Sequence, residues 1–124
     1  MITWNNLDKL ASYQELEKTE SVDLAAVMTG ENGAERVKNY SVPMAEGLAY
    51  NYAAKKVDDT VLAALEKLAE EAQLAEKFEA VYNGEVVNTG EKRLVLHHMT
   101  RGQLGEAVEA DGVDKRTFYV EQQK

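Results

Sequence analysis

Apolar side chains recur at helical spacing in five segments of the chain. Polar residues of the kind that cap helices stand at the start of each segment: Asn5 or Asn6, Ser21, Asn32, Asp58 or Asp59, and Asp114. Asn32 is followed three residues later by Glu35, the spacing of a capping box. Gly30 and Pro43 mark two of the ends, since both residue types interrupt helices. The predicted helices cover residues 5–18, 21–29, 33–40, 60–79 and 115–124.

The longest of these helices does not keep one apolar face. Its apolar residues from Val61 to Ala72 share a face, whereas those from Leu74 to Val81 fall on roughly the opposite face at ~100° per residue. One alternative is a helix that is buried on both sides. We favour a break near Gln73 that divides the segment into two helices.

Two segments follow the period of a strand instead. Between residues 48 and 53, Leu48, Tyr50 and Tyr52 alternate with smaller side chains, which places the large ones on one face. Residues 85–87 form the other β-prone run. Because a strand cannot satisfy its own backbone hydrogen bonds, we expect these two segments to pair with each other or with chain beyond Lys124.

Residues 83–102 combine the signals of a turn, a strand and a further helix. In chain order these are the turn pair Asn83-Gly84, the strand 85–87, a cap at Asn88 or Thr89, Glu91 in the first helical turn, Arg101 in the last, and Gly102 as the stop. The following residues to Gly112 are expected to form a loop with a turn at Asp111-Gly112.

The same stretch resembles the phosphoglucose isomerase family. The run Gly84-Glu85-Val86-Val87-Asn88, followed by Glu91-Lys92-Arg93-Leu94-Val95-Leu96-His97 and Arg101, is similar to the family signature without a gap. Departures from it are Gly90 for Thr, Leu94 and Met99 for Ala, and Thr100 for Leu. Upstream, the run from Gly47 to Val57 resembles the family's Gly-Leu-x-x-Asp-Tyr-Ser-Lys-Asn segment. The resemblance extends from residue 47 to residue 101.

The resemblance implies an amino-terminal segment of a larger α/β isomerase. In this family, glucose 6-phosphate and fructose 6-phosphate are interconverted without metal, a step of glycolysis and gluconeogenesis. The phosphate loop, the catalytic Glu, the ring-opening His and the Lys of the family have no counterpart in this chain. We therefore expect no catalytic, cofactor-binding or metal-binding residues here, and an inactive, architectural segment whose partner is the remainder of the isomerase, with sugar phosphate bound only by the full-length enzyme. The alternative is a self-standing helical interaction or assembly module.

The expected fold is mainly α with a short β-hairpin or strand pair, in a single domain over residues 1–124. A formal net charge of -8 argues against a nucleic-acid surface, and no apolar run approaches membrane-spanning length. The chain has no cysteine, which excludes disulfides and thiolate metal sites. Because no targeting segment is recognisable, we expect a cytoplasmic protein.

Few side chains suggest chemistry of their own. His97 and His98 are the only histidines, and neighbouring helical positions point ~100° apart, so a shared metal is disfavoured. We expect His97 to be a hydrogen-bonded packing residue and His98 a surface residue. Glu91 and Arg101 should complement the helix dipole, with Arg93 bridging to carboxylates of neighbouring elements.

The chain ends within a predicted helix, which favours truncation of a longer protein. Such a segment should expose apolar side chains that its missing part covers, and should self-associate into an oligomer. The candidates for this exposed surface are Leu74, Phe78, Leu94 and Phe118.

Overall fold

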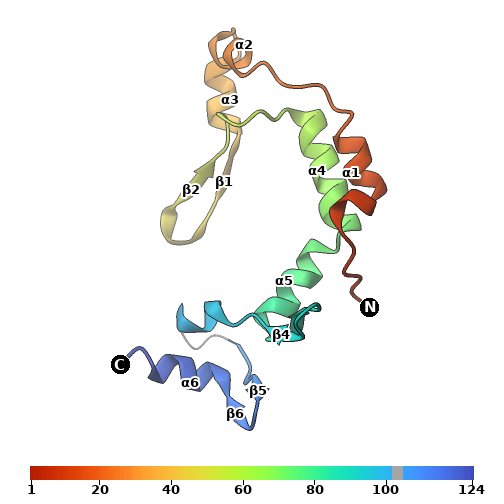
Figure 1. The fold of residues 1–124 in the computed structure, drawn as a ribbon. Helices are drawn as coiled ribbons and strands as arrows, with labels where there is room; N and C mark the ends of the chain where they lie inside the picture. The colour runs from red at the N-terminus through yellow and green to blue at the C-terminus, as the bar shows by residue number, and fades with distance from the viewer. Residues whose placement is uncertain (102–104) are drawn as a thin grey trace. The chain divides into compact units, whose positions relative to one another are not determined.

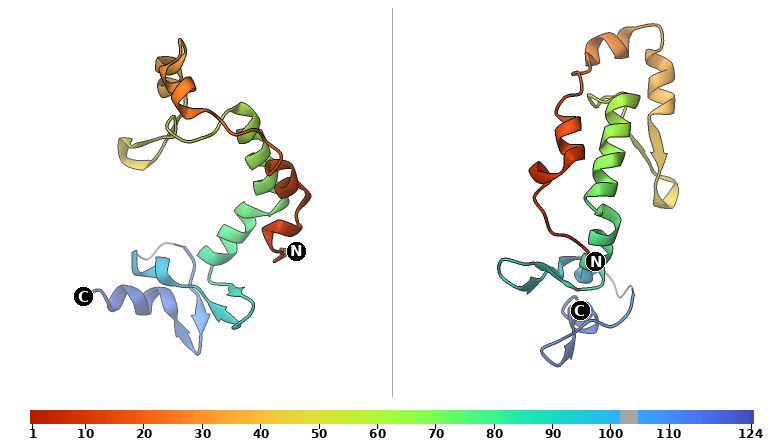
Figure 2. Two further views of the ribbon diagram at one scale, coloured as in Figure 1. Left: turned by 45° about the horizontal axis from the view of Figure 1, so that its top comes forward. Right: turned by 90° about the vertical axis from the view of Figure 1, so that its right-hand side faces the viewer.

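The computed structural model describes residues 1–101 and 105–124. Helices dominate, and the described residues add three two-stranded antiparallel sheets, so the expectation of a mainly α fold with a short hairpin is confirmed. The chain divides into two compact units: an amino-terminal unit, Asn5–Glu71, and a carboxyl-terminal unit, Ala72–Lys124 together with Met1–Trp4. Figures 1 and 2 show the elements of each.

The amino-terminal unit contains four α-helices and one hairpin. Its elements are η1 (Leu7–Lys9), α1 (Ala11–Leu16), α2 (Leu24–Thr29), α3 (Gly33–Asn39), β1 (Ser41–Pro43), η2 (Ala45–Gly47), β2 (Ala49–Asn51) and α4 (Asp59–Glu71), where η denotes a 3-10 helix. Helix α1 lies alongside α4 (Figure 2). The buried apolar residues of this unit, Leu10, Val22 and Ala53, lie outside the helices and strands.

The predicted helix over residues 5–18 is wrong in its extent. Leu10 takes an extended conformation, with φ −87° and ψ 139°, which separates the 3-10 turn η1 from α1. Its side chain is buried, so packing outweighs the continuity of the helix. Two capping assignments also change: Asp23 rather than Ser21 caps α2, and Asn32 makes no side-chain capping bond at α3. Asp58 caps α4 by accepting the Val61 N–H at 2.8 Å.

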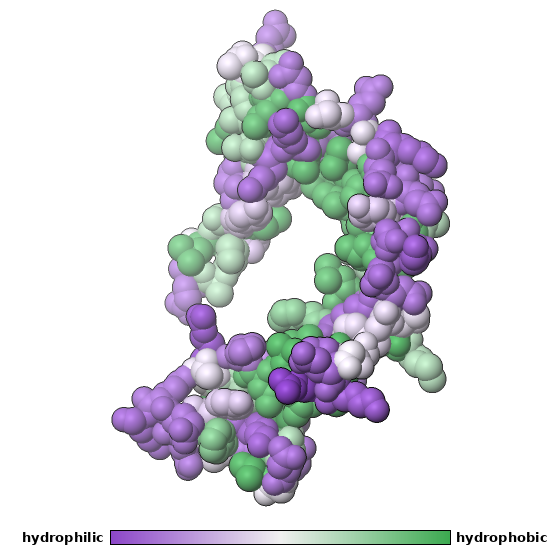
Figure 3. All heavy atoms as spheres, in the orientation of Figure 1, coloured by the Kyte–Doolittle hydropathy of each residue, from purple (hydrophilic) through white to green (hydrophobic). Residues whose placement is uncertain are grey.

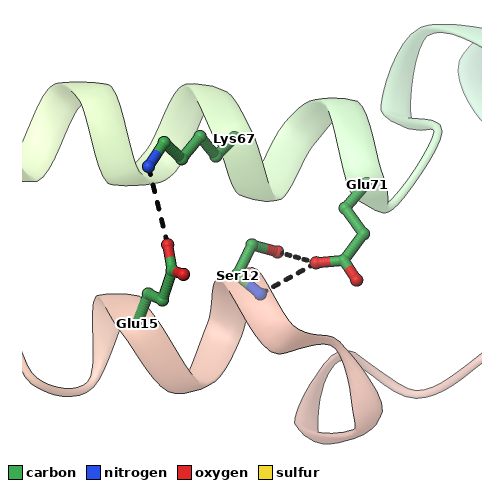
Figure 4. A network of polar contacts seen from close by, with 4 residues as sticks. All are labelled: Ser12, Glu15, Lys67 and Glu71. Carbon is green, nitrogen blue, oxygen red and sulfur yellow. Dashed lines mark hydrogen bonds and ion pairs between the residues drawn. The ribbon is translucent and has the colours of Figure 1, made fainter.

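Glu71, at the carboxyl end of α4, caps the start of α1 (Figure 4). Its carboxylate accepts the backbone N–H groups of Ser12 at 2.8 Å and Ala11 at 3.3 Å, and also the Ser12 hydroxyl. The Ser12 hydroxyl and backbone bonds hold the pKa of Glu71 below its ordinary value of 4.5. Lys67 and Glu15 add an exposed ion pair of 3.6 Å between the same helices.

The Glu71 cap makes the amino-terminal unit acid-sensitive. Because the folded pKa of Glu71 lies below the ordinary value of 4.5, its contribution to stability is present above that pH and is lost as the pH falls through the folded pKa. We expect the exchange protection of the Ser12 amide, measured by NMR, to fall on acidification below pH 4.5, and Glu71→Gln to lower it already at neutral pH. Glu70→Gln, at the neighbouring exposed position, is the control; an equal loss of protection there would contradict the role of Glu71.

The strand pairing in this unit differs from the prediction. Residues 48–53 do contain a strand, β2, but it pairs antiparallel with β1, with Val42 opposite Tyr50, and not with residues 85–87. The chain reverses through η2, where Glu46 and Gly47 both have positive φ, 57° and 73°. A local turn therefore satisfies the strand without a distant partner.

In its described residues, the carboxyl-terminal unit combines two α-helices and one 3-10 helix with two small hairpins. Its elements are α5 (Leu74–Tyr82), β3 (Val86–Asn88), β4 (Arg93–Leu94), η3 (His97–Arg101), β5 (Glu109–Ala110), β6 (Val113–Asp114) and α6 (Lys115–Glu121). Its buried apolar residues are Ala72, Ala80, Met99 and Val108. Asp114 caps α6 by accepting the N–H groups of Arg116 and Thr117, as predicted, and Asp111-Gly112 forms the predicted turn, here between β5 and β6.

The predicted break near Gln73 is confirmed. Gln73 takes a left-handed conformation, with φ 53° and ψ 47°, which ends the path of α4 and allows α5 to begin at Leu74. Its side-chain oxygen accepts the Thr3 N–H at 2.8 Å, and its amide nitrogen donates to the Met1 carbonyl at 3.3 Å. The change of apolar face along the sequence thus marks a real change of helix.

The predicted helix over residues 89–101 is wrong. Asn88 accepts the Glu91 N–H at 3.1 Å and Lys92 has a positive φ of 54°, so the chain turns back and β4 pairs with β3. The only helical part is the 3-10 turn η3. The side-chain oxygen of Asn88 can accept a backbone N–H group either as a helix cap or within a turn. In this structure it closes a turn. The predicted helix stop at Gly102 lies outside the described residues.

Candidate functional site

One residue that the sequence singled out, His98, lies against Tyr82, the last residue of α5. His98 Nε2 lies 3.0 Å from the Tyr82 carbonyl oxygen, and the two rings stack with centroids 5.4 Å apart. The bond requires the proton on Nε2. His98 is half-buried, whereas His97 is exposed. The expectation that His97 packs and His98 lies on the surface is therefore wrong, because residues 97–101 form a 3-10 turn that directs His98 toward Tyr82.

Arg116 of α6 completes this cluster. It is 2% exposed, and its Nη2 donates to the Tyr82 carbonyl oxygen at 2.6 Å while its Nε donates to the Glu106 carbonyl. The guanidinium carbon lies 5.0 Å from the centroid of the Tyr82 ring. The arginine thus joins α5, the segment before β5, and α6. Its donors serve the backbone, so the cluster acts as a structural joint.

His97 borders a small cavity. The lining residues are Leu94, Leu96, His97, Thr100 and Tyr119, and the volume is about 170 Å³. Small-molecule sites begin at about 300 Å³. Neither lysine nor arginine lines the cavity, so it is unsuited to a sugar phosphate.

The charged residues of the resemblance lie at the surface. Arg93 Nη1 is 3.7 Å from Glu91 Oε2, with exposed fractions of 75% and 63%, so the pair contributes little to stability. Arg93 therefore pairs within its own hairpin instead of bridging to a neighbouring element. Arg101 is exposed at the end of η3. These groups form neither an anion clamp nor an acid–base pair around a cavity.

A wider cavity of about 640 Å³ lies in the amino-terminal unit, between α2, α3 and the start of α4. Three carboxylates line it, Glu31, Glu35 and Asp59, against one cation, Arg36. Burial and the hydrogen bond from its hydroxyl to Asp59, 3.1 Å long, raise the pKa of Tyr40 on the wall. An anionic substrate would meet net negative charge here.

Arg36 is the counterpart of Arg116 in the amino-terminal unit. Its guanidinium donates to the carbonyl oxygens of Ala53 at 2.9 Å, Lys55 at 3.0 Å and Val57 at 2.8 Å. Its Cζ lies 4.3 Å from the centroid of the Tyr40 ring. Sequence reasoning missed both arginines, because backbone carbonyl acceptors leave no trace in the residue types.

The described residues offer neither a metal site nor a membrane span. Within residues 1–101 and 105–124, no three His, Asp or Glu side chains are grouped in a way that could hold a metal ion. Each helix in these ranges is too short or too polar to traverse a lipid bilayer.

Comparison with known proteins identifies the chain's relatives. The glucose-6-phosphate isomerase of Treponema denticola is 49% identical over 126 residues, which cover 98% of this chain and 24% of that protein. The isomerase of Treponema pallidum is 45% identical over 100 residues, 81% of this chain and 19% of that protein. That of Borreliella afzelii is 38% identical over 121 residues, 96% of this chain and 22% of that protein.

The chain spans about a quarter of the length of these curated relatives, and the matched part is their amino-terminal part. The family model described as phosphoglucose isomerase matches residues 51–123. This match includes most of the resemblance seen at residues 47–101 and continues beyond it. The chain therefore belongs to the phosphoglucose isomerase family.

Proposed function

We propose that this chain serves as the architectural amino-terminal segment of a glucose-6-phosphate isomerase, which interconverts glucose 6-phosphate and fructose 6-phosphate. The observation that carries the proposal is the match of 98% of the chain to 24% of an isomerase at 49% identity. Residues 1–124 act as one domain whose partner is the rest of the isomerase polypeptide. The full-length enzyme is a cytoplasmic homo-oligomer in this proposal.

The side-chain arrangement supports an architectural role. Aldose–ketose isomerisation needs a positioned base and cationic groups for the phosphate. Arg116, the most buried cation among the described residues, donates its hydrogen bonds to backbone carbonyl oxygens. Arg36 does the same in the amino-terminal unit. Glu71 and Asp114, the carboxylates whose pKa values are lowered, cap helices. In this proposal the described residues of the chain alone supply no catalytic residue, cofactor-binding residue or metal ligand.

A chimaera tests this proposal. The part of the Treponema denticola isomerase that matches this chain is replaced by residues 1–124, and fructose 6-phosphate turnover is measured by a coupled assay. We expect kcat/KM within about tenfold of the parent enzyme, because no reacting group is exchanged. The 124-residue chain alone, and the parent enzyme without its matching part, should show no turnover.

Two results would overturn the proposal. A soluble, folded chimaera without activity would show that this chain does not replace an isomerase segment. Turnover by the chain alone, persisting after a second purification step and absent from a mock preparation, would show that it carries a catalytic site of its own.

A further inference from the structure

The β1–β2 hairpin has one uniformly apolar face. Alternation along each strand places every second side chain on the same side, and the pairing of Val42 with Tyr50 sets the register. The pattern extends beyond the strands, since Met44 N–H donates to Leu48 O at 2.8 Å and Tyr52 N–H donates to Tyr40 O at 2.9 Å. The hairpin face consists of Tyr40, Val42, Met44, Leu48, Tyr50 and Tyr52.

The inner end of the hairpin face is held in place by stacked rings. Tyr40 and Tyr52 stack with centroids 5.1 Å apart, and Tyr52 and Tyr50 follow at 6.2 Å. The Arg36 guanidinium lies against Tyr40 at the inner end of this stack. The face is therefore ordered before any partner arrives, which lowers the entropic cost of docking.

The outer part of the hairpin face is exposed. The exposed fractions are 45% for Val42, 58% for Met44, 65% for Leu48 and 47% for Tyr50. In Figure 3 the hairpin shows green spheres beside paler and purple ones. A groove of about 420 Å³ continues the surface toward α4, lined by Val42, Tyr50, Tyr52, Lys55, Val57 and Leu62.

The opposite face of the hairpin carries smaller or polar side chains. These are Ser41, Pro43, Ala49 and Asn51. Asn51 donates from its side-chain amide to the Val37 carbonyl of α3 at 2.6 Å. A two-stranded hairpin is only marginally stable in water, and one with an exposed apolar face needs a permanent cover.

We propose that the hairpin face docks onto an apolar patch of the remaining isomerase polypeptide within the full-length enzyme. This inference rests on the proposed function, since the curated relatives extend over about four times the length of this chain. A docking partner in the same polypeptide is present whenever the protein is folded. The hairpin, which is only marginally stable by itself, requires such a permanent partner. The hairpin face contains no Asp, Glu, Lys, Arg or His, so the complementary patch is apolar as well.

Hydroxyl-radical labelling followed by mass spectrometry tests the docking. In the 124-residue chain, Met44 and Tyr50 should react as exposed side chains. In the full-length chimaera their labelling rates should fall by about tenfold or more, because an interface core excludes solvent. Met99, which is fully buried, should remain unreactive in both, and an added reporter peptide calibrates the dose. Unchanged labelling of Met44 and Tyr50 in the active chimaera would overturn the inference.

A pair of adjacent substitutions gives an independent test. Leu48→Glu places a charge on the hairpin face, whereas Ala49→Glu places the same charge on the opposite, also exposed face. In the full-length chimaera, Leu48→Glu should lower the melting temperature by about 3 °C or more, and Ala49→Glu by less than about 1 °C. Equal shifts would contradict a docked hairpin face.

The outcomes separate the possible occupants. Protection that disappears when the chimaera is diluted to monomers, checked by sedimentation, would assign the cover to a second copy and overturn the inference. Protection already present in the 124-residue chain would assign it to this chain itself, with the same consequence. A folded chimaera without isomerase activity refutes the proposed function. An active chimaera in which hydroxyl radicals still label Met44 as fast as in the 124-residue chain refutes only the docking.

Discussion

Replacing Arg116 with methionine should lower the free energy of unfolding of the carboxyl-terminal unit by about 3 kcal/mol. The substitution leaves the Glu106 carbonyl without its buried donor and the Tyr82 carbonyl with the His98 bond alone, and it removes the contact with the Tyr82 ring. Methionine preserves most of the apolar volume, so the loss reports on the guanidinium. Arg116→Lys should recover little, since an ammonium lacks the planar fork that reaches both carbonyls.

The fluorescence of Trp4 provides the measurement. It is the only tryptophan of the chain and lies in this unit, 5.5 Å from the Lys77 ammonium. Urea titrations of the native chain and the variant give the difference in unfolding free energy. Lys115→Met is the matched control: Lys115 is half-buried, but its ion pair spans 3.6 Å to an Asp111 side chain that is 92% exposed, so its loss should lower the free energy of unfolding by less than about 1 kcal/mol. Equal losses at both positions would contradict the specific role of Arg116.

Replacing Arg36 with methionine should destabilise the amino-terminal unit by about 2 kcal/mol. Three backbone carbonyls, from Ala53 to Val57, lose their common donor, and Tyr40 loses its stacking partner. We expect a smaller effect than at Arg116, because Arg36 is half-buried and water can replace part of its hydrogen bonding.

Hydrogen–deuterium exchange shows which part of the chain Arg36→Met destabilises. Peptides spanning residues 52–62 should exchange faster in Arg36→Met, while peptides from α6 keep their native rates. Lys38→Met changes an exposed cation on the same helix and serves as the control. Unchanged exchange over residues 52–62 in Arg36→Met would show that the three carbonyl contacts do not hold this loop.

The sequence predicted most helices because their determinants are local. The switch of apolar face at Gln73 located the break between α4 and α5, and Asp114 located the start of α6. The failures arose where one local signal has two structural outcomes. Asn88 could cap a helix or close a turn, and the pairing of β2 depended on the turn at Glu46 and Gly47.

For the candidate site, the sequence predicted only which kinds of functional residue should be absent. The expected absence of catalytic and metal-binding residues followed from family motifs that the chain lacks, and it stays a prediction. The exposure expected at Leu74, Phe78 and Phe118 is confirmed, with 59%, 70% and 42% of each residue accessible, whereas Leu94 is half-buried. The structural roles of Arg36 and Arg116 could not be predicted from the sequence, because any residue type can provide the backbone carbonyl oxygens that they bind.

The hairpin face has a consequence for biosynthesis. If the chain is the amino-terminal segment proposed above, it leaves the ribosome while roughly three quarters of the polypeptide remains to be made, which takes tens of seconds at about 5–20 residues per second. During that interval the apolar hairpin has no cover. Pro43 in β1 lacks the N–H group that another nascent chain would need for pairing along that strand. In that case the proline removes one backbone donor through which the unfinished polypeptide could aggregate before its docking partner has been synthesised.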